Sequence, residues 1–456
     1  MDIINPATEK LIRSLQEDSE DTIRGKFKIA KEAQSRWQSV PLDQRLKVID
    51  TFKSLLQERT EELAEALTEE VGKPITQSKA EIKGTVERID YFLKMTPSLL
   101  QKDLVTETSA STQEVVERDP LGVIANISAW NYPYFVGSNV FIPALLCGNA
   151  VLYKPSEYAS LTGLSIHSLM DEAGLPDGLF NVVIGRATEG SLLLETPING
   201  VFFTGSYATA QKIATTCGPK MIRTQFECGG KDPSYVCDDA PVESSAESLC
   251  EGSFFNAGQS CCAVERIYVH EAVYDDFLES FIEKAKLWTV GPPTDAQTQL
   301  GPLTRKEQIA VIQDQIQDAF EKGAKIALGG KSKSGPGNFF EATVLTNVNH
   351  EMKLMREESF GPVIGIQKVK NDHEAIEKMN DTQYGLTAGV YSSDQSRAET
   401  ILRSVNSGTS YWNCCDRVSP TSPWSGRNHS GLGATLGKEG ILNFTRPKAF
   451  HFRSPV

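Results

Sequence analysis

The spacing of apolar and polar residues divides the first quarter of the chain into a helical region and an extended or irregular region. Over residues 22–71 and 82–95, apolar residues recur at helical spacing between charges, which predicts amphipathic helices that pack on a core. Residues 104–118 are rich in Thr and Ser and alternate in polarity, which fits either a loose loop or an extended hairpin that leaves the body of the protein. As a hairpin, this segment has a partner strand in residues 449–452.

From Pro120 onward, short apolar strands alternate with helices. In the first of two such regions, strands are predicted at 123–127, 150–153, 181–184, 201–203 and 223–226, and helices at 139–146, 161–173 and 208–215. In the second region, strands are predicted at 266–270, 325–328, 364–369 and 388–391, and helices at 273–288 and 306–322. This alternation is typical of an α/β fold whose parallel sheets are covered on both faces. Ligands bind such sheets at the carboxyl ends of the strands.

Composition narrows the class of protein. A chain of 456 residues exceeds one compact core, so we expect two or three domains. The net charge of −13 argues against nucleic acid or an anionic membrane as the main partner. No apolar run is long enough to span a bilayer, and the first residues lack the pattern of a signal peptide. Nine cysteines without a CxxC pair suit a reducing, cytoplasmic setting and neither a disulfide framework nor a zinc site.

Two adjacent cysteines are the first candidates for chemistry. Cys261 and Cys262 follow a Gly-Gln-Ser turn and precede the predicted strand 266–270. A thiol just after a bend at the edge of a regular element has the exposure that a nucleophile needs. Most free cysteines are small core residues, so this pattern alone leaves both roles open.

Polar residues at four predicted strand ends favour the catalytic role. Asn131 follows the first strand, where a side-chain amide can donate to a developing oxyanion. Lys154 and Glu157 follow the second strand, where a carboxylate can accept from ribose hydroxyls. Ser206 opens a helix after the third strand, a suitable site for a diphosphate. Glu227 ends the fourth strand before a double glycine and is a candidate general base.

These stretches and several later ones resemble motifs of the NAD(P)-dependent aldehyde dehydrogenase superfamily, in that family's order, from about residue 5 to residue 448. The motifs are Trp130-Asn131-Tyr132-Pro133, Lys154-Pro155-Ser156-Glu157, Phe203-Thr204-Gly205-Ser206, Phe226-Glu227-Cys228-Gly229-Gly230-Lys231, Gly258-Gln259-Ser260-Cys261, Glu357-Glu358-Ser359-Phe360-Gly361-Pro362-Val363, Asn380, Tyr384-Gly385-Leu386 and Trp412-Asn413. Each motif alone is a weak signal, whereas their common order is specific.

The resemblance implies a role for each matched position. Cys261 would be the nucleophile, Glu227 the general base and Asn131 the oxyanion donor, together with the Cys261 backbone N–H. The implied cofactor is NAD, with NADP possible, and its binding residues would be Ile127, Trp130, Lys154, Ser156, Glu157, Phe203, Gly205, Ser206, Glu358 and Phe360. The implied aldehyde pocket consists of Tyr132, Tyr134, Val136, Ser260, Cys262, Val418 and Trp424.

The resemblance also implies a domain plan. A Rossmann-like, parallel-sheet cofactor domain would comprise residues 1–103 and 120–228, and an α/β catalytic domain residues 229–415. A β-strand oligomerisation arm would comprise residues 104–119 and 430–456, which implies a homodimer or homotetramer.

The chain departs from the family pattern at three places. Ala210 replaces a usual glycine in the helix after Ser206, and Cys228 replaces a usual leucine. Arg427-Asn428 stands where Tyr-Lys is common. Arg417 and Arg427 are candidate ligands for an acidic substrate such as a succinate semialdehyde-like compound, although exposed arginine is more often a surface residue.

The implied reaction is oxidation of an aldehyde to a carboxylic acid through a hemithioacetal and a thioester on Cys261. Glu157 favours NAD over NADP, because a carboxylate repels a 2′-phosphate. The alternatives are a coenzyme A-acylating dehydrogenase, which needs no water-activating base, a thiol hydrolase, and a non-catalytic member of the family.

Overall fold

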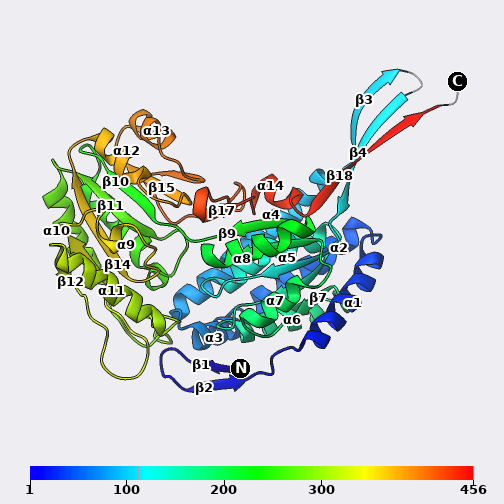
Figure 1. Ribbon diagram of the computed structural model, residues 1–456, viewed down its shortest axis with the longest axis horizontal. Helices are drawn as coiled ribbons and strands as arrows, with labels where there is room; N and C mark the ends of the chain where they lie inside the picture. Colours follow the sequence, from blue (N-terminus) through cyan, green and yellow to red (C-terminus); the bar gives the residue numbers. More distant parts are fainter. Residues whose placement is uncertain (110–111, 455–456) are drawn as a thin grey trace.

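The computed structural model describes residues 1–109 and 112–454, and two largely parallel β-sheets organise it (Figure 1). The first sheet has the strand order β17-β9-β8-β5-β6-β7. Its parallel strands are β5 (Val123–Ile127), β6 (Ala150–Lys154), β7 (Phe180–Val182), β8 (Gly200–Thr204) and β9 (Arg223–Glu227), and the short β17 (Gly431–Leu432) pairs antiparallel with β9. β5, β6 and β8 are buried along nearly their whole length, as expected for strands covered on both faces.

Eight helices that precede β9 in the described chain pack around the first sheet. They are α1 (Glu20–Trp37), α2 (Leu42–Glu58), α3 (Thr60–Val71), α4 (Ile75–Leu99), α5 (Pro133–Leu146), α6 (Ser160–Glu172), α7 (Ala187–Leu194) and α8 (Tyr207–Cys217). α5 begins at Pro133, six residues before the predicted start at residue 139. Proline suits the first position of a helix, because that position needs no amide donor.

The second sheet has the order β12-β13-β14-β11-β10-β15-β16 and is parallel except at β12. Its strands are β10 (Asp232–Val236), β11 (Val264–His270), β12 (Lys325–Leu328), β13 (Thr343–Thr346), β14 (Val363–Val369), β15 (Thr387–Tyr391) and β16 (Thr409–Trp412). The helices of this half are α9 (Val242–Phe254), α10 (Tyr274–Ala285), α11 (Glu307–Glu321), α12 (Asp372–Asn380) and α13 (Gln395–Arg403). The sheet has its own hydrophobic core, separate from the core around the first sheet.

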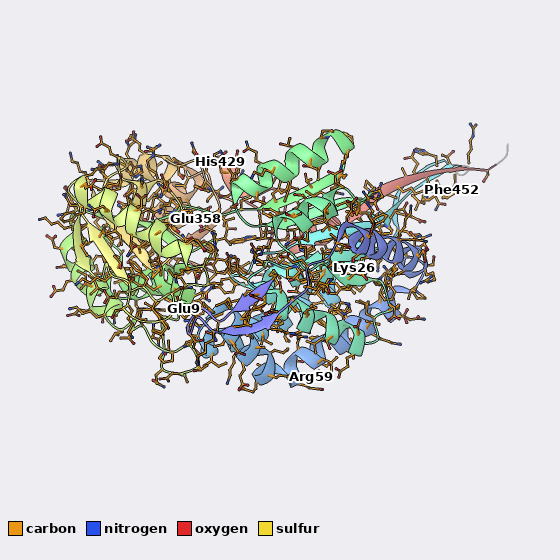
Figure 2. The ribbon with its side chains drawn as sticks, turned by 60° about the horizontal axis from the view of Figure 1, so that its bottom comes forward. Glu9, Lys26, Arg59, Glu358, His429 and Phe452 are labelled. Carbon is orange, nitrogen blue, oxygen red and sulfur yellow. The ribbon has the colours of Figure 1, made fainter. Side chains whose placement is uncertain are left out.

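A third, antiparallel sheet projects from the body (Figure 1). It consists of β3 (Asp103–Ser109), β4 (Thr112–Pro120) and β18 (Thr445–Arg453) in the order β18-β4-β3. The expected pairing of residues 449–452 with the hairpin is confirmed, since Phe452 lies opposite Gln113 and Ala449 opposite Val116. Phe452 stands far out on this arm (Figure 2).

The segment before β18 does not lie in the projecting sheet. β17 pairs with β9 in the first sheet, and α14 (Gly437–Leu442) packs against α4 and α5. The strand that enters the arm begins at Thr445, later than residue 430, because the intervening residues complete the first sheet and its core.

None of the described helices is both long and apolar enough to cross a lipid bilayer.

Candidate active site

The carboxyl ends of four neighbouring strands in the first sheet lie in register. Ile127 at the end of β5 lies between Lys154 of β6 and Phe203 of β8, and Thr204 lies opposite Glu227 of β9. The polar residues that follow these strands therefore meet along one edge of the sheet, as parallel topology requires.

Two cavities lie along this edge, and together they form a cleft. The larger, of about 530 Å³, extends over the ends of β5, β6 and β8 and the start of α8. The smaller, of about 340 Å³, lies at the end of β9 and is also lined by residues of the second half of the chain. Another cavity, of about 590 Å³, lies beside β1 (Asp2–Ile4), but Cys261, Glu227 and Asn131 do not line it.

Every cofactor residue predicted from the sequence lines one of the two cavities of the cleft. The larger is lined by Ile127, Trp130, Lys154, Ser156, Glu157, Phe203, Gly205 and Ser206, and the smaller by Trp130, Gly205, Ser206, Glu358 and Phe360. The smaller cavity also contains the three catalytic candidates, Cys261, Glu227 and Asn131. The fold thus brings together residues from six separate stretches of the chain.

Cys261 is partly exposed in a turn between α9 and β11. The turn is built from residues with positive φ, namely Asn256 (52°), Ala257 (54°) and Gly258 (70°). A Cβ on Gly258 would lie 2.2 Å from the Gly361 carbonyl oxygen, so the close approach of two backbones requires glycine here. This rigid turn presents the thiol to the cavity.

Asn131 is buried beside the same turn. Its Nδ2 donates to the Gln259 carbonyl at 3.1 Å, and Asn256 Nδ2 donates back to the Asn131 carbonyl at 3.2 Å. A side-chain amide carries two N–H donors. The bond to Gln259 orients the amide with one donor and leaves the second for an oxygen in the cavity.

Glu227 is 6 % exposed at the end of β9. Burial raises the pKa of its carboxyl to about 7, because desolvation disfavours the charged form. Three groups oppose this rise: Thr435 Oγ1 and Gln225 Nε2 donate to Glu227 Oε1, the latter at 3.2 Å, and the Arg88 guanidinium adds positive charge. The carboxyl is therefore poised to take up or release a proton near neutral pH.

Glu358 enters the cavity from the second half of the molecule and lies near the boundary between the halves in Figure 2. Its Oε1 accepts from Gly230 N at 3.2 Å, and burial raises its pKa to about 8. A Cβ on Gly229 would lie 2.0 Å from the same oxygen. The double glycine after β9 thus makes room for this second carboxyl group.

A buried ion pair supports the segment that carries Glu358. Lys231 Nζ lies 2.6 Å from Glu265 Oε2, and the Glu265 carboxylate also accepts from the backbone N–H groups of Ser359 and Phe360. Phe360 has a φ of 45°, and its ring lies edge-on to Trp130 at 5.5 Å between centroids. The two rings form an apolar wall of the smaller cavity.

The larger cavity carries hydrogen-bonding groups suited to a ribose. Ser156 Oγ donates to Glu157 Oε2 at 3.2 Å, and both residues are half-buried. Lys154 Nζ donates to the Gly185 carbonyl at 2.8 Å, and burial lowers the pKa of its ammonium. The Glu157 carboxylate can therefore accept from a ribose diol without a competing bond to Lys154.

The junction of the two cavities is suited to a diphosphate. Ser206 caps α8, with Oγ accepting from Thr209 N at 3.4 Å, and a helix N-terminus attracts anions. A Cβ on Gly205 would lie 2.6 Å from the Phe203 ring. A carboxylate for the ribose, a helix N-terminus for the diphosphate and two aromatic rings beside the reactive cysteine together fit a nicotinamide dinucleotide.

The residues predicted to form an aldehyde pocket line neither cavity of the cleft. They are Tyr132, Tyr134, Val136, Ser260, Cys262, Val418 and Trp424. Tyr134 and Trp424 are 1 % and 4 % exposed and belong to the core of the first sheet. Apolar side chains of this size stabilise the fold by packing, so the two residues are core residues in this structure.

Ser260 and Cys262, the two neighbours of Cys261 in the chain, contact Asp416. Both donate to Asp416 Oδ1, at 3.2 Å from Ser260 Oγ and 2.9 Å from Cys262 Sγ. A hydrogen bond with Cys261 and burial raise the pKa of the Cys262 thiol well above its usual value. Cys262 is therefore held as a neutral thiol, while Cys261 faces the cavity.

The departures from the family pattern are also accounted for. Ala210 is buried in α8, and Cys228 lines the smaller cavity with its thiol pKa raised by burial to about 12. Arg417 and Arg427 are exposed and line neither cavity. Arg427 Nε donates to the Ser407 carbonyl at 2.8 Å, a structural contact.

Comparison with known proteins was made against families, curated sequences and solved structures. Residues 1–450 match the model of the "Aldehyde dehydrogenase family". A betaine aldehyde dehydrogenase from Bacillus subtilis is 33% identical over 98% of this chain and 92% of its own length. The crystal structure of lactaldehyde dehydrogenase from Escherichia coli has a TM-score of 0.96 at 30% identity and covers 100% of this chain and 96% of its own. An NAD-dependent aldehyde dehydrogenase from Sinorhizobium meliloti gives 0.97 at 30%, covering 100% and 92%.

Proposed function

The chain belongs to the aldehyde dehydrogenase family, and on this premise we propose that Cys261, Glu227 and Asn131 together oxidise an aldehyde to a carboxylic acid. The chain is an NAD(P)-dependent oxidoreductase of this family. The roles of the three residues are what we propose. The observation that carries the assignment is the cavity of about 340 Å³ that all three side chains line. It combines an accessible thiol, a buried carboxyl of neutral pKa and an oriented amide.

In the first step, the Cys261 thiolate adds to the aldehyde carbonyl carbon, and the carbonyl oxygen becomes an oxyanion. Asn131 keeps one amide N–H on the Gln259 carbonyl, so its second N–H donates to the oxyanion. A preorganised donor of this kind lowers the barrier because it needs no reorganisation when charge develops. The product is a tetrahedral hemithioacetal on Cys261.

NAD(P) bound in the cleft supplies the acceptor for the hydride that leaves the former aldehyde carbon. Collapse of the hemithioacetal then leaves an acyl thioester on Cys261. Trp130 and Phe360 wall the cavity with apolar rings, and such a wall limits the access of bulk water to the reacting carbon.

In the last step, Glu227 as the carboxylate takes a proton from a water molecule, which attacks the thioester carbon. The acid is released, the Cys261 thiolate is restored, and Glu227 gives up its proton to solvent. A pKa of about 7 is suited to a general base that works near neutral pH. This base favours hydrolysis over transfer of the acyl group to coenzyme A, which would need no activated water.

We also propose that the projecting sheet of β3, β4 and β18 joins subunits into a homodimer or homotetramer. Phe452 is 53 % exposed on β18, with Phe450 stacked beside it, and an exposed sheet edge readily pairs with another chain.

A cytoplasmic location is proposed from the free cysteines, all nine of which lack a disulfide partner.

NADH formation with a panel of aliphatic, aromatic and carboxylated aldehydes tests the activity. The same measurement on variants tests the role of each residue. Cys261→Ala is expected to abolish NADH formation and to leave NAD binding intact, with Cys414→Ala as the matched control because Cys414 lines neither cavity. Glu227→Gln is expected to release a burst of NADH in stopped-flow and then stall at the thioester.

If Cys261→Ala retained turnover, the role of nucleophile would be assigned to Cys262. A missing burst in Glu227→Gln would mean that Glu227 acts before hydride transfer. If product formation by the wild type depended on coenzyme A, the last step would be acyl transfer to coenzyme A and the proposed hydrolysis would be wrong.

A further inference from the structure

Six residues line both cavities of the cleft and thereby mark the place where the cavities meet. They are Ala129, Trp130, Thr204, Gly205, Ser206 and Arg305. The first five lie at or just after the carboxyl ends of strands β5 and β8 of the first sheet. Arg305 comes from the segment before α11, in the half of the chain that forms the second sheet. Among the residues that the structure describes, it is the only one of that half that lines the larger cavity.

The Arg305 side chain is half-buried, and its hydrogen-bonding capacity is not used up by the protein. Its Nε is buried without a hydrogen-bond partner among the described residues. Its guanidinium carbon lies 5.9 Å from the centroid of the Tyr158 ring, and Tyr158 in turn lies edge-on to Trp130 at 6.3 Å. An aromatic face can hold a guanidinium in place while leaving its N–H donors free.

A buried hydrogen-bond donor without a partner raises the free energy of the protein, so a ligand that accepts from this donor gains binding free energy. In a nicotinamide dinucleotide, the diphosphate connects the adenosine ribose to the nicotinamide ribose. With the adenosine in the larger cavity and the nicotinamide in the smaller one, the diphosphate must cross the place where they meet. The start of α8, capped by Ser206, lies on one side of this place.

We propose that Arg305 binds the cofactor diphosphate from the wall opposite α8, so that the diphosphate is held between a helix N-terminus and a guanidinium. Guanidinium and phosphate form short, charge-assisted hydrogen bonds with a fixed geometry. Because Arg305 belongs to the half of the chain that carries Cys261 and Glu358, this contact also ties the cofactor to the catalytic half. The inference rests on the cofactor placement proposed above.

The experiment compares wild type with Arg305→Gln, Arg305→Lys and the matched control Lys306→Gln. Lys306 is the next residue, is exposed, and pairs with Glu9 at 2.9 Å outside the cleft. The ligands are ADP-ribose and 2′-phospho-ADP-ribose, measured by calorimetry, and adenosine, measured by ligand-observed NMR. Neither measurement requires turnover.

Arg305→Gln is expected to raise the Kd of ADP-ribose by about 10- to 100-fold, the range of a charge-assisted hydrogen bond, and to flatten its dependence on salt. The Kd of adenosine should stay unchanged. Arg305→Lys should restore part of the affinity, and Lys306→Gln should bind both ligands like wild type.

An unchanged Kd for ADP-ribose in Arg305→Gln would overturn the inference, and so would equal weakening of both ligands, since that would indicate a general change of the fold. A loss seen only with 2′-phospho-ADP-ribose would assign Arg305 to the 2′-phosphate instead. Failure of the wild type to bind ADP-ribose would overturn the cofactor placement itself, an outcome distinct from the failure of Arg305 alone.

Discussion

The two ends of the cleft lie on one edge of the first sheet, yet they are built differently. The larger cavity is lined by residues of the first half of the chain, with Arg305 as the exception. The smaller cavity combines strand ends of the first sheet with Cys261, Gln308, Glu358 and other residues of the second half. One end, called the open end below, is therefore formed almost wholly by the first half of the chain, and the other, called the enclosed end, lies between the two halves.

The carboxyl groups at the two ends have different surroundings. Burial raises the pKa of Glu227 to about 7 and that of Glu358 to about 8. Glu157, at the open end, is half-buried and accepts from a neighbouring serine. The two carboxyl groups whose pKa burial raises therefore lie in the smaller cavity, which Cys261 also lines.

The largest effect is expected at the enclosed end. Asn131→Ala removes the amide donor, and kcat/KM for aldehyde should fall by about 100- to 1000-fold, as for the loss of one oxyanion donor. Steady-state kinetics give this value, while the Kd of ADP-ribose measures the open end and should not change. If ADP-ribose binding weakened in parallel, Asn131 would be a structural residue that serves both ends.

An intermediate effect is expected at the open end. Glu157→Gln removes the charge that repels a 2′-phosphate, so the ratio of kcat/KM for NAD to that for NADP should fall by about tenfold. The burst of NADH at saturating NAD should keep its wild-type rate, because the enclosed end is untouched. A wild-type preference for NADP would refute the role of Glu157.

The smallest effect tests how the enclosed end tunes its base. The Thr435 hydroxyl donates to Glu227, and a donor to the charged form lowers a carboxyl pKa. Thr435→Val should therefore raise the Glu227 pKa above about 7. A general base works when ionised, so the acidic limb of the pH–rate profile of thioester hydrolysis should move to higher pH.

The rate of Thr435→Val should fall a few-fold at neutral pH and recover at alkaline pH. An acidic limb that stays in place while the rate falls at every pH would show that Thr435 positions the site without tuning Glu227.

Local patterns were sufficient to locate most of the cleft. The strands before Asn131, Lys154 and Ser206 were predicted because each is a short apolar run followed by turn residues. The strand that ends at Glu227 was also predicted, although its sequence is Arg-Thr-Gln-Phe-Glu. β10 (Asp232–Val236) was not predicted, since it follows a glycine pair and contains a proline. Only its central place in a sheet, between β11 and β15, makes it a strand.

Partners that are distant in sequence left no local signal. Thr435 contacts Glu227 across 208 residues, and Asp416 contacts Cys262 across 154. Neither residue type nor spacing distinguishes them from surface threonines and aspartates. For the same reason, residues adjacent to Asn131 were expected in a pocket, whereas Tyr134 packs into the core.

The sequence by itself determined the alternating α/β pattern and the order of the strand-end motifs, because these depend on residue types within short segments. The family resemblance of those motifs then selected Cys261, Glu227 and Asn131 as catalytic candidates. Only the tertiary structure decided which groups meet and how deeply they are buried. Burial raises the pKa of Glu227, the contact with Asp416 separates Cys262 from Cys261, and the fold brings Arg305 to the place where the two cavities meet. Desolvation and long-range contacts are properties of the packed molecule, which no short segment specifies.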